Sequence, residues 1–227
     1  ICESLGIEMI TIPMSETGPD MDMIEKLVAN DASIKGIWCN PKYSNPDGYI
    51  YSDETVERLA GMKTAAPDFR IFWDNAYVVH ALYGQHDDLA DIFSLCEKHG
   101  NPDRVFYFAS TSKITYPGAG VAVMAMSKAN LDHAKSILTV QTISYNKINQ
   151  LRHVRYLKDK AHTLEIMKRH ASVMAPKFRC VSRWLNQEIK PLDIAHWTDP
   201  SGGYFVSLYT MPGTAKRTWS LCREAGV

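Results

Sequence analysis

Residues 104–120 read Arg104-Val105-Phe106-Tyr107-Phe108-Ala109-Ser110-Thr111-Ser112-Lys113-Ile114-Thr115-Tyr116-Pro117-Gly118-Ala119-Gly120. The first part, 104–110, is a nearly continuous apolar run, which is typical of a strand in a sheet that is covered on both faces. Hydroxyl side chains, a lysine and several glycines follow it directly. Ligands of α/β proteins collect outside the carboxyl ends of the strands, so this order predicts a ligand site at the end of a buried strand.

Strand-like and helix-like segments alternate along the first half of the chain. Strands are expected over 8–13, 34–40, 70–74, 104–110 and 121–126. Helical patterns lie between several of them, over 21–30, 52–66 and 89–99. Ser52 followed by two acidic residues is typical of a helix N-cap. The alternation predicts an α/β fold with a mostly parallel sheet flanked by helices.

The pattern changes after residue 144. Apolar residues recur every three or four positions from Ile148 to Met174, which predicts one long helix that Pro176 kinks or ends. Beyond it we expect a helix over 177–187, strands near 193–197 and 204–210, and a helix over 214–225. The chain is therefore expected to hold an N-terminally incomplete large domain (1–147), an interdomain helix (148–175) and the start of a smaller α+β domain (176–227).

Composition excludes several classes of protein. No apolar run reaches the ~20 residues needed to cross a bilayer. The five cysteines are scattered and form no Cys-x-x-Cys pair, which favours reduced thiols in the cytoplasm over a metal site. Ten of the 25 basic residues lie between Lys147 and Arg183, but only two aromatic residues, Tyr156 and Phe178, lie among them, which is few for base stacking. We therefore interpret this block as a solvated helix face, and expect no nucleic-acid and no membrane partner.

Three segments that follow expected strands carry residues suited to chemistry. Asn40–Gly48 is, taken alone, a turn. Asp74 ends a strand, where a carboxylate needs a positive partner such as a protonated pyridine nitrogen, although capping a helix is the alternative. Lys113 follows a buried strand, where partial desolvation would favour the neutral amine that a Schiff base requires. For Lys113 taken alone, an ordinary lysine on the protein surface is an equally good interpretation.

Taken together, the three segments resemble fold type I aminotransferases, which depend on pyridoxal 5′-phosphate. The resemblance rests on Asn-Pro-Asp-Gly at 45–48, Asp-x-x-Tyr at 74–77 and Ser-x-Ser-Lys at 110–113, in this order. The stretches 43–48 and 110–120 are most similar to the aspartate-aminotransferase-like subgroup Ic, also called MocR-like aminotransferases. The similarity runs along the whole chain and implies the large domain of that fold with part of the small domain.

The resemblance implies roles for six residues, which are Asn45, Asp74, Tyr77, Ser110, Ser112 and Lys113. Lys113 resembles the lysine that forms the Schiff base and moves the substrate proton. Asp74 resembles the carboxylate that keeps the pyridine nitrogen protonated. Asn45 and Tyr77 resemble the pair that binds the cofactor's phenolic oxygen and keeps the pKa of the lysine–cofactor link low. Ser110 resembles a phosphate ligand, which Ser112 assists.

The chain departs from the family at one position. Many members carry an arginine seven or eight residues after the lysine to bind the phosphate, and Gly120 and Val121 stand there in this sequence. The cationic partner of the phosphate is therefore unassigned. The resemblance further implies that a phosphate loop precedes residue 1 and that the arginine for the substrate carboxylate follows residue 227, so we expect the chain alone to lack activity.

The implied reaction is amino-group transfer between an amino acid, with aspartate as the family-level choice, and a 2-oxo acid, in a homodimer. Two alternatives stay open: a β-lyase or decarboxylase on the same fold, and a regulatory domain that binds the cofactor without turnover. If the cofactor interpretation is right, the side chains of Asn45, Asp74 and Lys113 converge around one ring.

Overall fold

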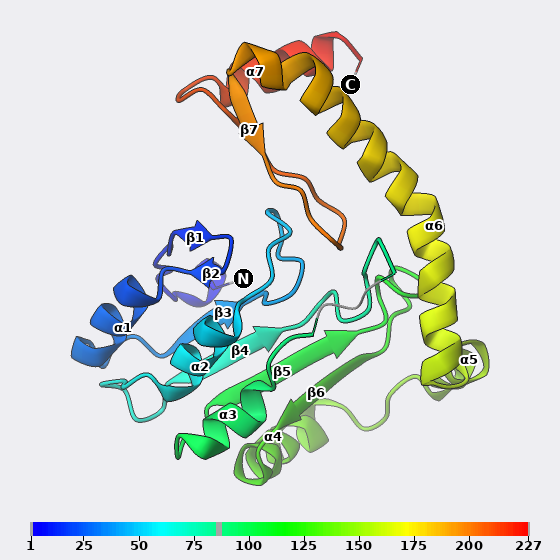
Figure 1. Ribbon diagram of the computed structural model, residues 1–227. Coiled ribbons are helices and arrows are strands. Elements are labelled where there is room, and N and C mark those ends of the chain that lie inside the picture. The colour runs from blue at the N-terminus through cyan, green and yellow to red at the C-terminus, as the bar shows by residue number, and fades with distance from the viewer. Residues whose placement is uncertain (1, 85–87, 227) are drawn as a thin grey trace. The chain divides into compact units, whose positions relative to one another are not determined.

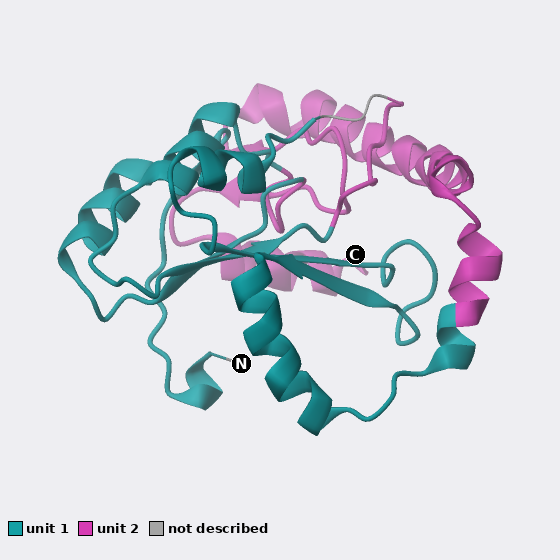
Figure 2. Cartoon of the chain, turned by 90° about the horizontal axis from the view of Figure 1, so that it is seen from below, with its two compact units in different colours: residues 1–42, 49–76, 88–150 teal, residues 43–48, 77–87, 151–227 magenta. Residues whose placement is uncertain are grey.

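The computed structural model describes residues 2–84 and 88–226, which form two compact units (Figures 1 and 2). Unit 1 comprises 1–42, 49–76 and 88–150, and unit 2 comprises 43–48, 77–87 and 151–227. Each loop of unit 2 that interrupts unit 1 follows one of its strands. Among the described helices, none is both long and apolar enough to cross a membrane.

The core of unit 1 is a four-stranded sheet in the order β3 (Gly36–Cys39), β4 (Arg70–Asp74), β5 (Val105–Ser110) and β6 (Ala122–Met126). The first three strands are parallel to one another, and β6 runs antiparallel to β5. The mostly parallel sheet expected from the sequence is therefore confirmed.

Three helices cover one face of this sheet: α1 (Met21–Asn30), α2 (Asp53–Gly61) and α3 (Ile92–Lys98). Each begins at a side-chain cap, and the Ser52 hydroxyl accepts a hydrogen bond from the Thr55 N–H at 3.2 Å, as the sequence predicted. Trp73 of β4 and Leu59 of α2 are fully buried in the shared core. Burial of such side chains stabilises each by about 1.5–3 kcal/mol.

The opposite face of the sheet carries a row of aromatic side chains. Trp38 stacks on Phe72 with ring centroids 5.5 Å apart, and Phe72 stacks on Phe108 at 6.3 Å. Helix α4 (Lys128–Gln141) lies on this side (Figure 2), yet Trp38 stays 62% exposed. Within the described residues, the apolar strands are thus fully covered on one face only, whereas both faces were expected to be covered.

The strand expected over 8–13 is wrong. Residues 8–11 are exposed and lie in an irregular segment that follows a short 3-10 helix, η1 (Glu3–Leu5). A two-residue ladder forms instead between β1 (Met14–Ser15) and β2 (Gly18–Pro19). An alternating apolar pattern makes a strand only where a neighbour satisfies its backbone groups, and no described strand pairs with 8–13.

The long helix expected over 148–175 is two helices, α5 (Lys147–Leu157) and α6 (Lys160–Trp184). Lys158 has a φ of 58°, in the left-handed region, and therefore interrupts the helix after α5. The Asp159 carboxylate then caps α6 by accepting a hydrogen bond from the His162 N–H at 2.8 Å. Pro176 lies inside α6 and does not end it. Figure 1 shows α6 as one continuous helix. A proline removes one helical hydrogen bond, and the helix around it continues.

The rest of unit 2 follows α6 through a π-helical turn, η2 (Leu185–Ile189), and a 3-10 turn, η3 (Lys190–Leu192). β7 (Ala195–Trp197) and β8 (Leu208–Thr210) pair antiparallel, and α7 (Ala215–Glu224) ends the described part of the chain. Leu82 packs with Ala175 and Phe178 of α6 in a small apolar core.

Candidate cofactor site

Asp74 and Lys113 follow neighbouring parallel strands at the same edge of the sheet. Asp74 is the last residue of β4 and pairs with Phe108 of β5. β5 ends at Ser110, and Lys113 comes three residues later. The Asn75 N–H donates to the Phe108 carbonyl at 3.0 Å, which extends the pairing past Asp74. The structure thus places the two residues at one edge, as parallel strands require.

The backbone around Asp74 is fixed on both sides. The Asn40 side-chain amide, just after β3, donates to the Asp74 carbonyl at 3.0 Å. Trp73 and Asn75 are buried, and the Asn75 amide donates to the Tyr107 hydroxyl at 2.7 Å. The Asp74 side chain itself is half-buried. A carboxylate held in this way can receive a cationic ring nitrogen without rearrangement of the strand end.

The loop that carries Lys113 is closed by Thr111. The Thr111 N–H donates to the Val121 carbonyl at 2.9 Å, and the Val121 N–H donates back to the Thr111 hydroxyl at 2.9 Å. The Ile114 and Thr115 N–H groups both donate to the Thr111 carbonyl at 2.9 Å. Residues 111–121 therefore form a tight loop at the end of β5.

The structure shows a steric constraint at Gly120, the first of the two positions where the family arginine usually stands. A Cβ atom at this position would overlap the Ser112 hydroxyl and would lie 3.0 Å from the Ser112 backbone N and Cα. Real Cβ contacts of that kind require the neighbour to move. The close approach of Gly120 to Ser112 therefore disfavours a side chain at position 120, because Ser112 would have to move.

Lys113 is exposed, which corrects the expectation that it would be partly desolvated. It lies in the turn beyond β5 and not in the buried strand. Ser110 and Ser112 are half-buried beside it in the chain. An exposed primary amine within three residues of two serine hydroxyls suits a cofactor that has an aldehyde and a phosphate.

Lys42 is not among the residues that the sequence predicted for the site. This lysine is only 6% exposed and comes three residues after β3, as Lys113 comes three residues after β5. A buried lysine is costly to the fold, and its position after a strand was the signal that could have found it. Lys42 is the second amine that a labelling experiment at this edge must distinguish from Lys113.

Other reactive groups in unit 1 have different environments. Burial raises the pKa of the Cys39 thiol to about 12 and that of Cys96 to about 11, so neither is a nucleophile near neutral pH. No cluster of three or more histidine, cysteine or acidic side chains that could hold a metal occurs among residues 2–84 and 88–226.

Asn45 and Tyr77 belong to unit 2. Asn45 is exposed on the loop 43–48, where the Gly48 N–H donates to the Ser44 carbonyl at 2.6 Å. Buried Tyr43 anchors the loop against Gly202, where a Cβ atom would overlap its ring. The Tyr209 hydroxyl donates to the Asp47 carboxylate. These contacts fix the loop that presents Asn45.

Tyr77 is 2% exposed, and its ring lies against those of His80 and Tyr204. Tyr204 is 127 positions further along the chain. Nothing in the sequence pattern pointed to Tyr204 or to His80 as neighbours of Tyr77.

All of residues 1–227 match the sequence model of the family described as aspartate aminotransferase. The chain belongs to this family. It is 45% identical over 227 residues to an aspartate aminotransferase of Corynebacterium glutamicum. The match covers 100% of this chain and 52% of that protein. A crystal structure of an aspartate transaminase from the same organism matches 99% of this chain and 53% of that chain, with a TM-score of 0.95.

A more distant structure supports the fold alone. An α-aminoadipate aminotransferase from Thermus thermophilus, 24% identical, matches 93% of this chain and 52% of that chain with a TM-score of 0.76. That protein is complexed with N-(5′-phosphopyridoxyl)-L-leucine. The chain spans about half the length of the curated relatives it matches. The fold is that of the fold type I aminotransferases, with a mixed sheet flanked by helices.

The residues of unit 1 fit pyridoxal phosphate by their chemistry. The strand end at Asp74 offers a carboxylate for the ring nitrogen, and the exposed Lys113 amine can be reached by an aldehyde. The loop 111–121 adds hydroxyl donors. Gly120 has no side chain, so a ligand can approach its backbone closely. Hydroxyl and backbone donors of this kind are common phosphate ligands.

Proposed function

We propose that this chain binds pyridoxal 5′-phosphate and, within a protein of its relatives' full length, transfers an amino group between an amino acid and a 2-oxo acid. One observation carries the proposal. In a chain that matches the aspartate aminotransferase family throughout, Asp74 and Lys113 follow adjacent parallel strands at one edge of the sheet.

Lys113 holds the cofactor in this proposal. Its Nζ would hold the cofactor at the cofactor's aldehyde carbon. Pyridoxal phosphate, when bound, supplies an electron-withdrawing ring that makes the α-proton of an amino acid acidic. The Lys113 Nζ would also be the group that takes up this α-proton and gives it back.

Asp74 keeps the ring nitrogen protonated. Its carboxylate would pair with that nitrogen. The Asn40 side-chain amide, which donates to the Asp74 carbonyl, and the Asn75 N–H, which donates to the Phe108 carbonyl, keep the strand end in place. Removal of the carboxylate would leave the ring nitrogen without its ion-pair partner.

Four further residues orient the cofactor. Asn45 and Tyr77 donate hydrogen bonds to its phenolic oxygen, and Ser110 and Ser112 donate to its phosphate. The roles follow the resemblance of 45–48, 74–77 and 110–113 to the family motifs. Residues 43–48 and 110–120 further support placement in the subgroup of MocR-like aminotransferases.

Aspartate is the proposed amino donor, because a relative 45% identical over the full chain is named an aspartate aminotransferase. The relatives' names favour amino transfer over β-elimination or decarboxylation. With the protein of full length, aspartate and 2-oxoglutarate, we expect oxaloacetate and glutamate in equal amounts. Release of ammonia, or of carbon dioxide without formation of glutamate, would instead show a lyase or a decarboxylase.

We also propose a homodimer in the cytoplasm. Five large hydrophobic side chains of the segment 137–148 are exposed: Ile137, Val140, Ile143, Tyr145 and Ile148. Exposed apolar groups that follow one another along a segment are typical of interaction surfaces. Cys180 and Cys222 are exposed free thiols, which a reducing compartment preserves. Light scattering of the full-length protein should give twice the mass of one chain, and a monomer would contradict the dimer.

A further inference from the structure

Three aromatic rings form a closed triangle in unit 2. The ring centroids of Tyr77 and His80 are 5.5 Å apart, with the ring planes at 89°. Those of Tyr77 and Tyr204 are 6.0 Å apart at 64°, and those of His80 and Tyr204 are 5.5 Å apart at 70°. Edge-to-face contacts at these distances are favourable, and here each ring touches the other two.

The backbone holds this triangle from both segments. The His80 N–H donates to the Tyr77 carbonyl at 3.2 Å, and the Gly203 N–H donates to the His80 carbonyl at 2.9 Å. Ala81 and Gly202 form an antiparallel bridge next to them. The segments 77–82 and 201–204 are therefore fixed to each other by main-chain contacts, so the three rings meet in one defined arrangement.

We propose that His80 and Tyr204 are positioning residues, which hold the Tyr77 ring so that its hydroxyl can donate to the phenolic oxygen of the cofactor. The inference rests on the proposed function of Tyr77. Tyr77 and His80 are 2% and 4% exposed, so the Tyr77 ring has little freedom while both neighbours are present. Loss of either ring removes one side of its support.

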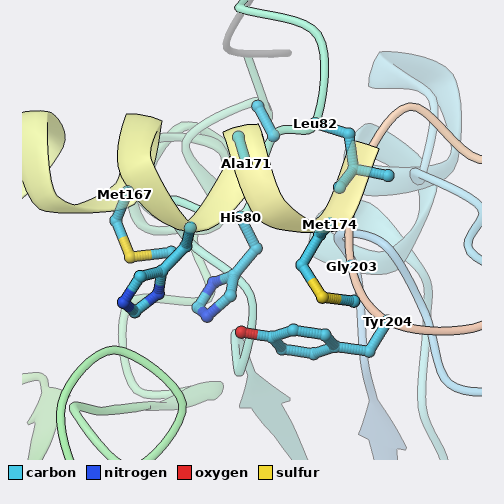
Figure 3. Close-up of a pocket in the computed structure, with 9 residues that line it drawn as sticks. His80, Leu82, Met167, Ala171, Met174, Gly203 and Tyr204 are labelled. Carbon is cyan, nitrogen blue, oxygen red and sulfur yellow. The ribbon is translucent and has the colours of Figure 1, made fainter. Parts of the chain in front are cut away.

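A small hollow lies beside the three rings, so the Tyr77 ring depends on contact with its two neighbours to stay in place. It is lined by His80, Tyr204 and Gly203 and, from α6, by Met167 and Met174 (Figure 3). Figure 3 shows the His80 ring next to that of Tyr204. Truncation of His80 to alanine would join its volume to the hollow. Such space allows the neighbouring rings to tilt, because a cavity that does not collapse leaves its lining mobile.

The test follows the bound cofactor by its visible absorption as a function of pH, in the full-length protein. Tyr77→Phe, which lacks the hydroxyl, should raise the pH midpoint of that absorption change by about one unit. His80→Ala should move the midpoint in the same direction and by less. His80→Phe keeps a ring in place and should restore the wild-type midpoint. In Tyr77→Phe/His80→Ala, no shift should occur beyond that of Tyr77→Phe.

Other outcomes overturn the inference. A wild-type midpoint in His80→Ala shows that the ring does not position Tyr77. Shifts of the two single variants that add in the double variant show that His80 acts independently of the Tyr77 hydroxyl. A shift that persists in His80→Phe assigns the effect to the imidazole nitrogens and not to the ring packing. If His80→Ala fails to fold, Tyr204→Ala and Tyr204→Phe take the place of His80→Ala and His80→Phe, with the same expected results. Tyr204 is only half-buried, so its truncation disturbs the fold less.

A second readout separates this inference from the proposed function. If the wild-type protein binds no cofactor, the proposed function is wrong. The ring-flip rate of Tyr77, measured by nuclear magnetic resonance on the unliganded protein, still tests the triangle. It should increase in His80→Ala and stay at the wild-type value in His80→Phe. Equal rates in wild type and His80→Ala would contradict the support that His80 gives.

Discussion

Gly120 approaches Ser112 so closely that a Cβ atom at position 120 would overlap the Ser112 hydroxyl. The relationship ties the sequence departure at Gly120 to the geometry of the loop that carries Lys113. The φ angle of Gly120 is not in the left-handed region, so the constraint is the contact and not the backbone conformation.

Gly120→Ala should therefore destabilise the protein by about 1–3 kcal/mol, because the added methyl group forces Ser112 to move. Urea unfolding measures the free-energy change, and equilibrium dialysis measures an expected loss of cofactor affinity. Ser112→Ala/Gly120→Ala should recover part of the stability, because the overlapping oxygen is gone while the backbone contact at 3.0 Å remains. Gly118→Ala is the matched control, since nothing lies within 4 Å and only its φ of 81° causes strain. Equal stability of Gly120→Ala and wild type would refute the steric account.

Asp74→Asn should lower kcat by about 100- to 1000-fold, because the neutral amide no longer keeps the ring nitrogen protonated. Thermal unfolding should stay near that of the wild type, since the half-buried side chain lies at a strand end. Asp68→Asn is the control: this carboxylate lies before the other end of β4, where it binds Lys35 at 2.8 Å. Turnover of Asp74→Asn equal to that of Asp68→Asn would remove Asp74 from the site.

The buried thiol of Cys39 should make stability depend on alkaline pH. Burial raises its pKa from 9.0 to about 12, so the folded state keeps a proton that the unfolded state loses. The stabilisation is complete below pH 9.0 and is lost as the pH rises toward about 12. The free energy of unfolding of Cys39→Ala should thus approach that of the wild type with rising pH. For Cys96→Ala, the free energy of unfolding should approach that of the wild type as the pH rises toward about 11. A difference between wild type and Cys39→Ala that is constant from pH 8 to 11 would contradict the shift.

The central strands could be predicted from the sequence because one pattern determines them. β4 was expected at 70–74 and is found there, and β5 begins one residue later than expected. Both are buried apolar runs that polar residues end. The segment 8–13 has a similar pattern but lacks a neighbour, which a single stretch of sequence does not reveal. The break before α6 depends on the positive φ of Lys158, which leaves no mark on the apolar periodicity.

The sequence predicted which residues of the candidate site follow which strand. It did not predict the side chains that pack against them. Asp74 and Lys113 could be assigned to one edge because parallel strands end together. The exposure of Lys113 and the burial of Lys42 depend on loop packing beyond the strands. The contact of Tyr77 with Tyr204 joins segments 127 positions apart, and local patterns carry no information on such pairs.

Borohydride reduction of the full-length protein loaded with pyridoxal phosphate tests most directly whether Lys113 carries the cofactor. Reduction converts the C=N bond to a stable amine, and mass spectrometry of the peptides then locates it. The label should lie on the peptide that contains Lys113, disappear in Lys113→Arg and remain in Lys42→Arg. A label on Lys42 or on any other lysine, or no label on the loaded protein, would contradict the assignment of Lys113.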